Sequence, residues 1–421
     1  MKKDKLIRFS DAVKETLPTA FHVMAKPIGP ICNLDCTYCY YLEKKNLYRE
    51  RKNFKMSEEV LEAYIRQMIE GQEVGEILFV WQGGEPTMMG LDFYEKAIEL
   101  QKIYAGEKKI SNSFQTNGTL LTADWCKFFK KHNFLVGISI DGPADLHDKY
   151  RKYRNGNPSY SQVMKGIKLL RRFQVEFNTL TVVNNINVKY PLEVYNFLKK
   201  IGSGFIQFIP IVERIAYDVE PDELALVAPE YSNEAKVSPW SVNPIKYGKF
   251  LSQIFDEWVL TDVGKYYVQI FDVTLANWVG APPGLCVFGE TCGFATALEH
   301  NGDLYACDHY VYEENFLGNI LDTPIVKLIQ LAEQKKFGYD KRDKLPTVCI
   351  MCEYRFACHG ECPKNRVAKT AENQEGLNYL CEGLKHYFGH VHPFMDFMSE
   401  ELKNKRPPAN VMNWAKRRKN E

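Results

Sequence analysis

Strand-like and helix-like stretches alternate along the first half of the chain. The run Ile-Leu-Phe-Val-Trp at 77–81 is continuously apolar, which is typical of a strand buried on both faces. Strand-like runs occupy residues 21–26, 77–81, 113–116, 135–140, 177–183 and 205–209. Stretches with helical periodicity occupy residues 58–70, 91–104, 122–129, 161–173 and 191–201. This alternation predicts an α/β fold with a parallel sheet and right-handed crossovers.

Local signals place the ends of two of these helices. Ser57 precedes one helix and Thr122 precedes another, and both residue types favour the N-cap position. Gly71 is expected to end the first of them. About six strand–helix units predict a partial (β/α)6 TIM-like barrel. Because sites in such barrels lie at the C-terminal ends of the strands, residues that follow each strand are the candidates for chemistry.

The second half of the chain changes character twice. Residues 212–243 are acidic, contain three prolines and lack periodicity, which predicts an insertion or a surface linker. A helix is expected over 245–260, and we place a domain boundary near Pro282, where the composition shifts again. The predicted division is a lead segment at 1–20, a barrel at 21–212, an insertion and connecting helix at 213–281, a cysteine-rich domain at 282–393 and a C-terminal helix and basic tail at 394–421.

Composition and charge exclude several classes of protein. The 421 residues are 45% hydrophobic and 25% charged, as in a globular protein with two or three domains. A formal net charge of +1 provides no global field for nucleic acid or an anionic membrane, and we interpret the basic end at 416–420 as a solvated tail. No apolar run approaches a membrane span and the charged N-terminus lacks a signal-peptide core, so we expect a cytoplasmic protein. Its twelve cysteines then favour metal or cluster ligation over disulfides.

Three of the cysteines lie on one short segment after the first predicted strand. Cys32, Cys36 and Cys39 have the spacing C-x3-C-x2-C, and Tyr38 directly precedes the third. Three thiolates can hold three irons of a 4Fe–4S cluster and leave the fourth iron open, whereas ordinary clusters have four protein ligands. A zinc site is the alternative, but it would need a fourth ligand, and His22 is poorly placed to supply it. A disulfide framework does not fit an odd number of cysteines.

This motif resembles the signature of the radical SAM superfamily. In that superfamily the open iron binds S-adenosylmethionine, and an electron passed to the sulfonium produces a 5′-deoxyadenosyl radical. The resemblance extends to Gly83-Gly84-Glu85-Pro86, which follows the strand at 77–81. It implies that this segment, through Gly84, holds the amino group of the methionine.

Residues at or beyond the ends of later strands complete the predicted cofactor site. Ser139 offers a hydroxyl to the same amino group. Arg151 can bind the methionine carboxylate through two parallel N–H bonds, with a surface ion pair as the alternative interpretation. Val212 is expected to lie against the adenine through its backbone. Together with Tyr38 and Gly84, these residues form the predicted cofactor-binding set.

A second group of cysteines follows the predicted boundary near Pro282. Eight thiols there are enough for two four-thiolate sites, and their spacing alone neither pairs them nor excludes zinc. They are Cys286, Cys292, Cys307, Cys349, Cys352, Cys358, Cys362 and Cys381. The remaining cysteine, Cys126, lies on a predicted helix and is expected to be a buried small residue.

The complete pattern resembles the anaerobic sulfatase-maturating enzymes, radical SAM proteins whose SPASM domain carries two auxiliary 4Fe–4S clusters. The similarity runs from about Phe21 to Pro393 and is densest in KPIGPICNLDCTYCYYLEK, WQGGEPT, QTNGTLLT, SIDGP, HDKYR, ALEHNGDLYACDHYV, LGNI and CEYRFACHGECPKNR. It implies three 4Fe–4S clusters and two interleaved auxiliary ligand sets, one of Cys286, Cys292, Cys307 and Cys362 and the other of Cys349, Cys352, Cys358 and Cys381. Pro158 departs from the pattern, since relatives usually have a glycine there, and it stiffens the loop after Arg151.

The resemblance also implies a reaction. A cysteine or serine in the active-site peptide of a sulfatase would be oxidised to Cα-formylglycine, with an external one-electron donor such as flavodoxin or ferredoxin. Asp308, directly after Cys307, is the candidate general base for the thiol or hydroxyl proton, and an adjacent cluster would accept the electron. A structural aspartate is the alternative interpretation, and His309 and Tyr310 rank below Asp308 as bases. Tyr41 and Gln82 are expected to line the pocket.

Two other functions fit parts of the pattern. A different SPASM enzyme would crosslink another peptide, but such enzymes commonly carry a leader-binding domain, and residues 1–31 are too few for a usual domain. A non-catalytic zinc or iron–sulfur module would not need the motifs GGEP, SIDG and HDKYR beyond successive strands. We therefore favour the sulfatase-maturating function, with cysteine and serine both open as targets.

Overall fold

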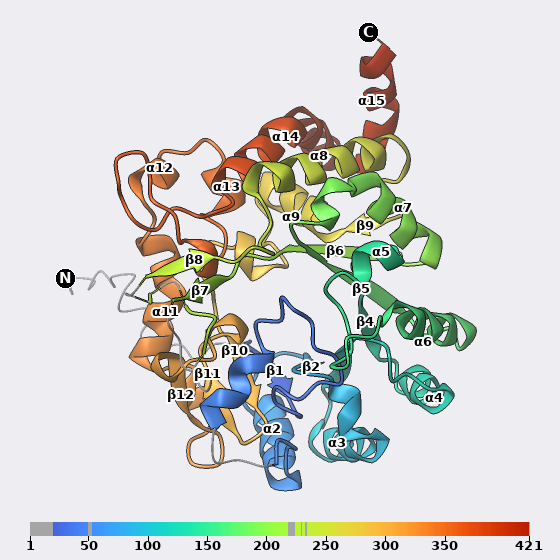
Figure 1. The fold of residues 1–421 in the computed structure, drawn as a ribbon, viewed down its shortest axis with the longest axis vertical. Helices are drawn as coiled ribbons and strands as arrows, with labels where there is room; N and C mark the ends of the chain where they lie inside the picture. Colours follow the sequence, from blue (N-terminus) through green and yellow to red (C-terminus); the bar gives the residue numbers. More distant parts are fainter. Residues whose placement is uncertain (1–19, 49–52, 218–223, 229, 232–233, 421) are drawn as a thin grey trace, which may run out of the picture.

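The fold was analysed in a computed structural model, which describes residues 20–48, 53–217, 224–228, 230–231 and 234–420. The predicted lead segment at 1–20 therefore lies almost wholly outside the described residues, as do parts of the predicted insertion. A ten-stranded sheet organises the molecule, with the strand order β12-β11-β10-β1-β2-β3-β4-β5-β6-β9. Figure 1 shows this sheet curving around a central space in which the loop after β1 lies.

Six strands and the helices between them form the predicted partial barrel. Every neighbouring pair from β1 to β6 is parallel. The strands are β1 (His22–Lys26), β2 (Glu76–Trp81), β3 (Lys109–Thr116), β4 (Leu135–Ser139), β5 (Phe177–Val183) and β6 (Phe205–Pro210). The helices are α2 (Glu58–Glu70), α3 (Leu91–Tyr104), α4 (Ala123–Lys131), α5 (Ala144–His147), α6 (Tyr160–Arg172) and α7 (Pro191–Ile201). The predicted alternation of strands and helices is confirmed.

The caps expected from the sequence form. The side chain of Ser57 accepts a hydrogen bond from the backbone N–H of Val60, and that of Thr122 accepts one from Trp125. Each bond satisfies one of the backbone donors that a helix start leaves free. Cys126 on α4 is fully buried in the apolar core, as expected of a small residue with no ligand role.

The sheet continues past the barrel at both edges. At one edge β9 (Tyr267–Val268) pairs parallel with β6. At the other edge β10 (Ala295–Glu299) pairs parallel with β1 and is followed by the antiparallel strands β11 (Asp303–Tyr305) and β12 (Phe316–Asn319). The register of β1 and β10 places Glu299 opposite Lys26. The chain after Pro282 is thereby brought against the C-terminal end of the first barrel strand.

Helices and a small hairpin complete the fold. The hairpin of β7 (Arg214–Ala216) and β8 (Ala235–Val237) lies in the region predicted as an insertion. The remaining helices are α8 (Pro244–Thr261), α9 (Gln269–Trp278), α10 (Ile325–Leu328), α11 (Ala332–Asp343), α12 (Thr347–Ile350), α13 (Arg355–Cys358), α14 (Cys381–Lys403) and α15 (Val411–Asn420). Among the described residues, no helix is both long and apolar enough to cross a bilayer.

The crossing of α8 and α14 depends on two glycines. A Cβ atom on Gly383 would lie 1.9 Å from the carbonyl oxygen of Pro244, and one on Gly248 would lie 2.2 Å from the carbonyl oxygen of Gly383. Both contacts are with backbone, which cannot move aside as a side chain can. The close approach of the two helices therefore requires glycine on each side.

Gly383→Ala is expected to lower the melting temperature, because overpacking in a tight contact costs about 1–3 kcal/mol. Thermal unfolding followed by circular dichroism measures the change. The control is Gly389→Ala on the same helix, whose Cβ would meet only the Tyr354 hydroxyl at 3.6 Å. Because alanine is the better helix former, that variant should be as stable as the parent or more so. Equal stability of the two variants would contradict the packing argument.

Candidate functional site

The loop with the first three cysteines is anchored to the barrel by backbone contacts. The N–H of Asp35 donates to the carbonyl of Lys152 at 2.8 Å, and that of Cys39 donates to Cys36 at 2.9 Å. In the segment after β2, the N–H of Glu85 donates to the carbonyl of Ile31 at 2.9 Å. A Cβ on Gly84 would lie only 2.0 Å from that same carbonyl oxygen. The glycine motif therefore lies directly against the cysteine loop, and any side chain at Gly84 would displace it.

The thiols of this loop have the chemistry of a cluster ligand set. Cys32, Cys36 and Cys39 form no disulfide. Burial raises the pKa of Cys32 to about 12 and raises the pKa values of Cys36 and Cys39 as well. Thiols so placed stay protonated unless a strongly positive group compensates, and cluster irons supply that charge. The three residues fit the open 4Fe–4S cluster that the spacing predicts.

Arg151 lies beside this loop and is buried. Its Nε is 3.1 Å from the Oδ2 of Asp141, and its side chain is only 9% exposed. A surface ion pair, the alternative interpretation from sequence, is therefore wrong. The pair leaves the terminal guanidinium nitrogens without a hydrogen-bond partner among the described residues. Such nitrogens suit a carboxylate, which is the role predicted for Arg151.

The other predicted cofactor residues contact groups from several elements of the chain. The hydroxyl of Tyr38 donates to Asp141, which links the cysteine loop to the end of β4. Ser139 accepts a hydrogen bond from Gln115 at 3.0 Å. Val212 is buried, and its carbonyl accepts from the Nζ of Lys364 at 2.7 Å. Their contacts with S-adenosylmethionine stay predictions.

Arg151→Lys is expected to weaken the binding of S-adenosylmethionine about tenfold or more, because an ammonium keeps the charge but loses the planar fork. Equilibrium binding to the anaerobically reconstituted protein measures the effect. Lys152→Arg, an exposed neighbour whose side chain makes no ion pair within the described chain, is the matched control. If both variants bind like the parent, Arg151 has no part in holding the carboxylate.

Four cysteines of the C-terminal half gather near β11 and α11. Burial raises the pKa of Cys307, and the nearby thiolates of Cys362 and Cys286 raise it further. Burial also raises the pKa of Cys292, to about 11, and Cys286 adds to it. These are the four residues of the first predicted auxiliary set, Cys286, Cys292, Cys307 and Cys362. The negative charges of four neighbouring thiolates repel one another, which favours binding of one iron cluster whose positive irons compensate them.

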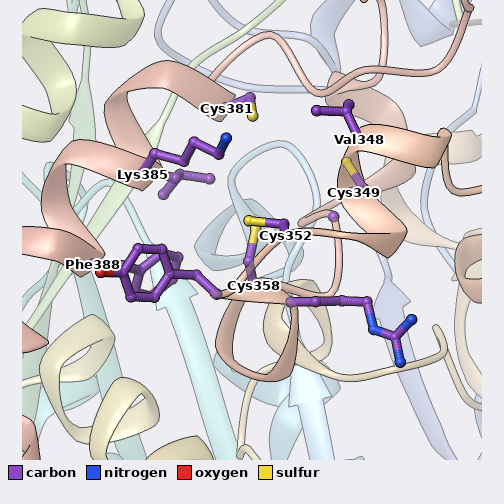
Figure 2. A pocket seen from close by; sticks show the side chains of 11 residues that line it. Val348, Cys349, Cys352, Cys358, Cys381, Lys385 and Phe388 are labelled. Carbon is purple, nitrogen blue, oxygen red and sulfur yellow. The ribbon is translucent and has the colours of Figure 1, made fainter.

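The other four cysteines surround a pocket. Cys349 lies on α12, Cys358 ends α13, Cys381 begins α14 and Cys352 lies between the first two helices. All four line one pocket, together with apolar residues such as Leu384 and Phe388 (Figure 2). Burial raises the pKa of Cys349 to about 11 and that of Cys358 to about 12. The pocket fits the second predicted cluster.

Asp308 lies between the two cysteine-rich regions. Its Oδ2 accepts a hydrogen bond from the hydroxyl of Tyr40 at 2.6 Å, and its Oδ1 forms an ion pair with Lys26. Lys26 is 1% exposed and Asp308 is 16% exposed. Burial, the largest single effect, raises the pKa of Asp308, but Lys26, His309 and the hydrogen bond from Tyr40 together outweigh it and the net pKa is about 2. The carboxylate is therefore ionised at neutral pH and partly accessible.

Sequence reasoning missed the residues that hold Asp308. Tyr40 follows the third loop cysteine directly, and Lys26 is the last residue of β1. The neighbouring Tyr41, predicted to line the pocket, donates instead to Glu299 at 2.5 Å, and Lys26 lies 3.9 Å from the centre of its ring. The one indication in the sequence that Lys26 has a special role was its position as a charged residue at the end of a buried strand. Its partner Asp308 could not be predicted from the sequence, because it lies 282 positions further along the chain.

Comparison with known sequences agrees with the site. Residues 27–198 match the Radical SAM superfamily. The chain is 52% identical over 391 residues to the serine-type anaerobic sulfatase-maturating enzyme of Bacteroides thetaiotaomicron, covering 93% of this chain and 94% of the relative. It is 35% identical over 371 residues to the cysteine-type anaerobic sulfatase-maturating enzyme of Clostridium novyi, covering 87% and 94%.

A solved structure extends the similarity to three dimensions. It is described as native anSMEcpe with bound AdoMet and Cp18Cys peptide, and it matches with a TM-score of 0.78 at 31% sequence identity, over 90% of this chain and 99% of that one. The match includes the cysteine-rich C-terminal half as well as the barrel. The chain belongs to the anaerobic sulfatase-maturating enzymes of the radical SAM superfamily, as the cysteine loop, the partial barrel and these near full-length matches show.

Proposed function

We propose that this enzyme oxidises a serine in the active-site peptide of a sulfatase to Cα-formylglycine, with Asp308 as the general base. The hydrogen bond of 2.6 Å from Tyr40 to Asp308 carries the proposal, because Tyr40 follows the cluster ligand Cys39 directly. A proton acceptor thus lies beside the loop at which the radical is made. The choice of serine rests on the 52% identity to a serine-type relative.

Cys32, Cys36 and Cys39 would hold the open 4Fe–4S cluster, and Gly84, Tyr38, Ser139, Arg151 and Val212 would orient S-adenosylmethionine. When bound, this pair of cofactors supplies the 5′-deoxyadenosyl radical that takes a hydrogen atom from the substrate Cβ. The buried ion pair of Arg151 with Asp141 holds the guanidinium in place before the cofactor arrives. The chain would therefore bind S-adenosylmethionine in one orientation.

Asp308 would take the proton of the substrate hydroxyl. Tyr40 and Lys26 hold the carboxylate at two oxygens, so its position is set before substrate binds. A carboxylate with a pKa near 2 is a weak base, and general bases work best near the operating pH. We infer that the substrate hydroxyl replaces the Tyr40 contact as it binds, so that it donates its hydrogen bond to the oxygen of Asp308 that would receive the proton.

The eight cysteines after Pro282 would hold two further 4Fe–4S clusters, one of them at Cys307 beside Asp308. Such clusters would provide redox capacity next to the site of oxidation. We propose the polypeptide of a sulfatase as the partner that enters the site, and an external one-electron donor such as flavodoxin or ferredoxin as the second partner. The cytoplasmic location stays a prediction.

Paired peptides that differ only in serine or cysteine at the target test the proposed function. The anaerobically reconstituted enzyme is expected to form aldehyde from the serine peptide, detected by hydrazone formation and by the mass change. Cleavage of S-adenosylmethionine is followed in the same samples. Aldehyde from the cysteine peptide alone would overturn the serine assignment, and aldehyde from neither peptide while S-adenosylmethionine is cleaved would overturn the function.

A further inference from the structure

The two predicted auxiliary sites are joined by an unusual turn. Cys358 belongs to one predicted set and Cys362 to the other, and only three residues separate them. All three have a positive φ, namely His359 at 48°, Gly360 at 72° and Glu361 at 51°. A left-handed conformation costs a non-glycine residue about 1–2 kcal/mol, so two such residues within one three-residue turn need support from their surroundings.

Arg366 provides that support. Its Nε donates to the carbonyl of Gly360 at 3.1 Å, and its Nη2 donates to His359 at 3.1 Å and to Glu361 at 3.4 Å. The guanidinium therefore binds the carbonyls of all three left-handed residues. Its Nη1 donates to the carbonyl of Lys341 at 2.6 Å. A single side chain thus ties the turn to helix α11.

The space around this contact is tight and its polar groups are satisfied. A Cβ on Gly360 would lie 2.3 Å from Leu345 and 2.7 Å from the Nη2 of Arg366. The carboxylate of Glu361 is buried and accepts hydrogen bonds from Asn365 at 2.9 Å and Asn378 at 2.6 Å. The backbone between Cys358 and Cys362 is therefore held on two sides, by Arg366 at its carbonyls and by the asparagines at Glu361.

The charge of Arg366 acts on both cysteine sets. Burial lowers the pKa of Arg366, whereas the thiolates of Cys349, Cys362 and Cys292 raise it. Cys349 belongs to the set around the pocket of Figure 2, and Cys362 and Cys292 belong to the other set. A guanidinium is always protonated, so this positive charge is present at any working pH.

We propose that Arg366 is a positioning residue shared by both auxiliary clusters, which holds the turn that supplies one ligand to each and raises the reduction potential of both. The inference rests on the two auxiliary clusters of the proposed function. Reduction adds negative charge to a cluster, and a nearby fixed cation stabilises the reduced form. Loss of the cation makes both clusters harder to reduce.

The test uses the full chain with Cys32, Cys36 and Cys39 replaced by alanine, so that the remaining iron signals belong to the auxiliary sites. After anaerobic reconstitution this parent should hold about eight irons, as two 4Fe–4S clusters require. Redox titration followed by electron paramagnetic resonance gives the midpoint of each cluster. In Arg366→Gln we expect both reduction equilibria to shift at least tenfold toward the oxidised form, which is about 59 mV for one electron.

Two further variants separate charge from position. Arg366→Lys keeps the charge but cannot reach all four carbonyls, so both midpoints should shift in the same direction by less than in Arg366→Gln. Arg355→Gln removes the same charge from an exposed residue that lines only the pocket of Figure 2. It should leave the midpoint of the other cluster unchanged. Loss of iron from both sites in either Arg366 variant would also support a shared positioning role.

Several results would overturn the inference. Full iron with both midpoints unchanged in Arg366→Gln would leave the residue without the proposed role. A shift or iron loss at one cluster alone would show that it is not shared, and equal shifts of both clusters in Arg355→Gln would show that the effect is not specific. A parent with about four irons or fewer would instead overturn the two-cluster assignment, and the inference with it.

Discussion

Replacing Asp308 with Asn is expected to lower formylglycine formation by about 10²–10⁴-fold, the usual contribution of a general base. Cleavage of S-adenosylmethionine should continue, because it needs the open iron and an electron, neither of which Asp308 supplies. Asparagine keeps the shape of the side chain and can still accept from Tyr40, so the site should remain folded. The measurement is the ratio of aldehyde to 5′-deoxyadenosine in the variant and in the parent.

The control for this variant is Asp322→Asn, an exposed aspartate in the same part of the chain, which should keep the parent ratio. An unchanged ratio in Asp308→Asn would remove Asp308 from the reaction. Loss of iron together with activity would point to a structural role beside Cys307. Because the variant removes the charge that pairs with the buried Lys26, iron content is measured together with the ratio.

Replacing Cys32, Cys36 and Cys39 together with alanine is expected to abolish 5′-deoxyadenosine formation. The protein should still bind substantial iron, because the eight predicted ligands after Pro282 are untouched. Cys126→Ala is the matched control, since this cysteine is buried in the apolar core and belongs to no predicted ligand set. It should keep both iron and cleavage. If the triple variant still produces 5′-deoxyadenosine, the radical is made elsewhere.

The barrel was predictable because its elements carry local signals. Each barrel strand is a short run bounded by turns, and each long helix repeats its apolar residues with the helical period. Helices α3 and α7 and strand β5 have the bounds expected from the sequence, and the caps at Ser57 and Thr122 form as expected. Local patterns of this kind are encoded within a few neighbouring residues.

The extension of the sheet by β10, β11 and β12 was not predictable in the same way. These strands have three to five residues each, too few to show a period. Their place is decided by the parallel pairing of β10 with β1 across about 270 residues of chain. Such pairings depend on the whole fold. The division into domains predicted from composition stays a prediction, and this sheet crosses its boundary near Pro282.

The sequence by itself determined the class of chemistry, because the spacing of Cys32, Cys36 and Cys39 specifies three neighbouring ligands on one loop. It also named Asp308, directly after Cys307, as the candidate general base, a role that stays a prediction. Only the tertiary structure decided which side chains surround these residues. Arg151 is a buried partner of Asp141 rather than a surface residue, and Asp308 is held by Lys26 and Tyr40. The physical reason is that ligand spacing is local, whereas burial and charge pairing arise where distant strands end at one edge of a sheet.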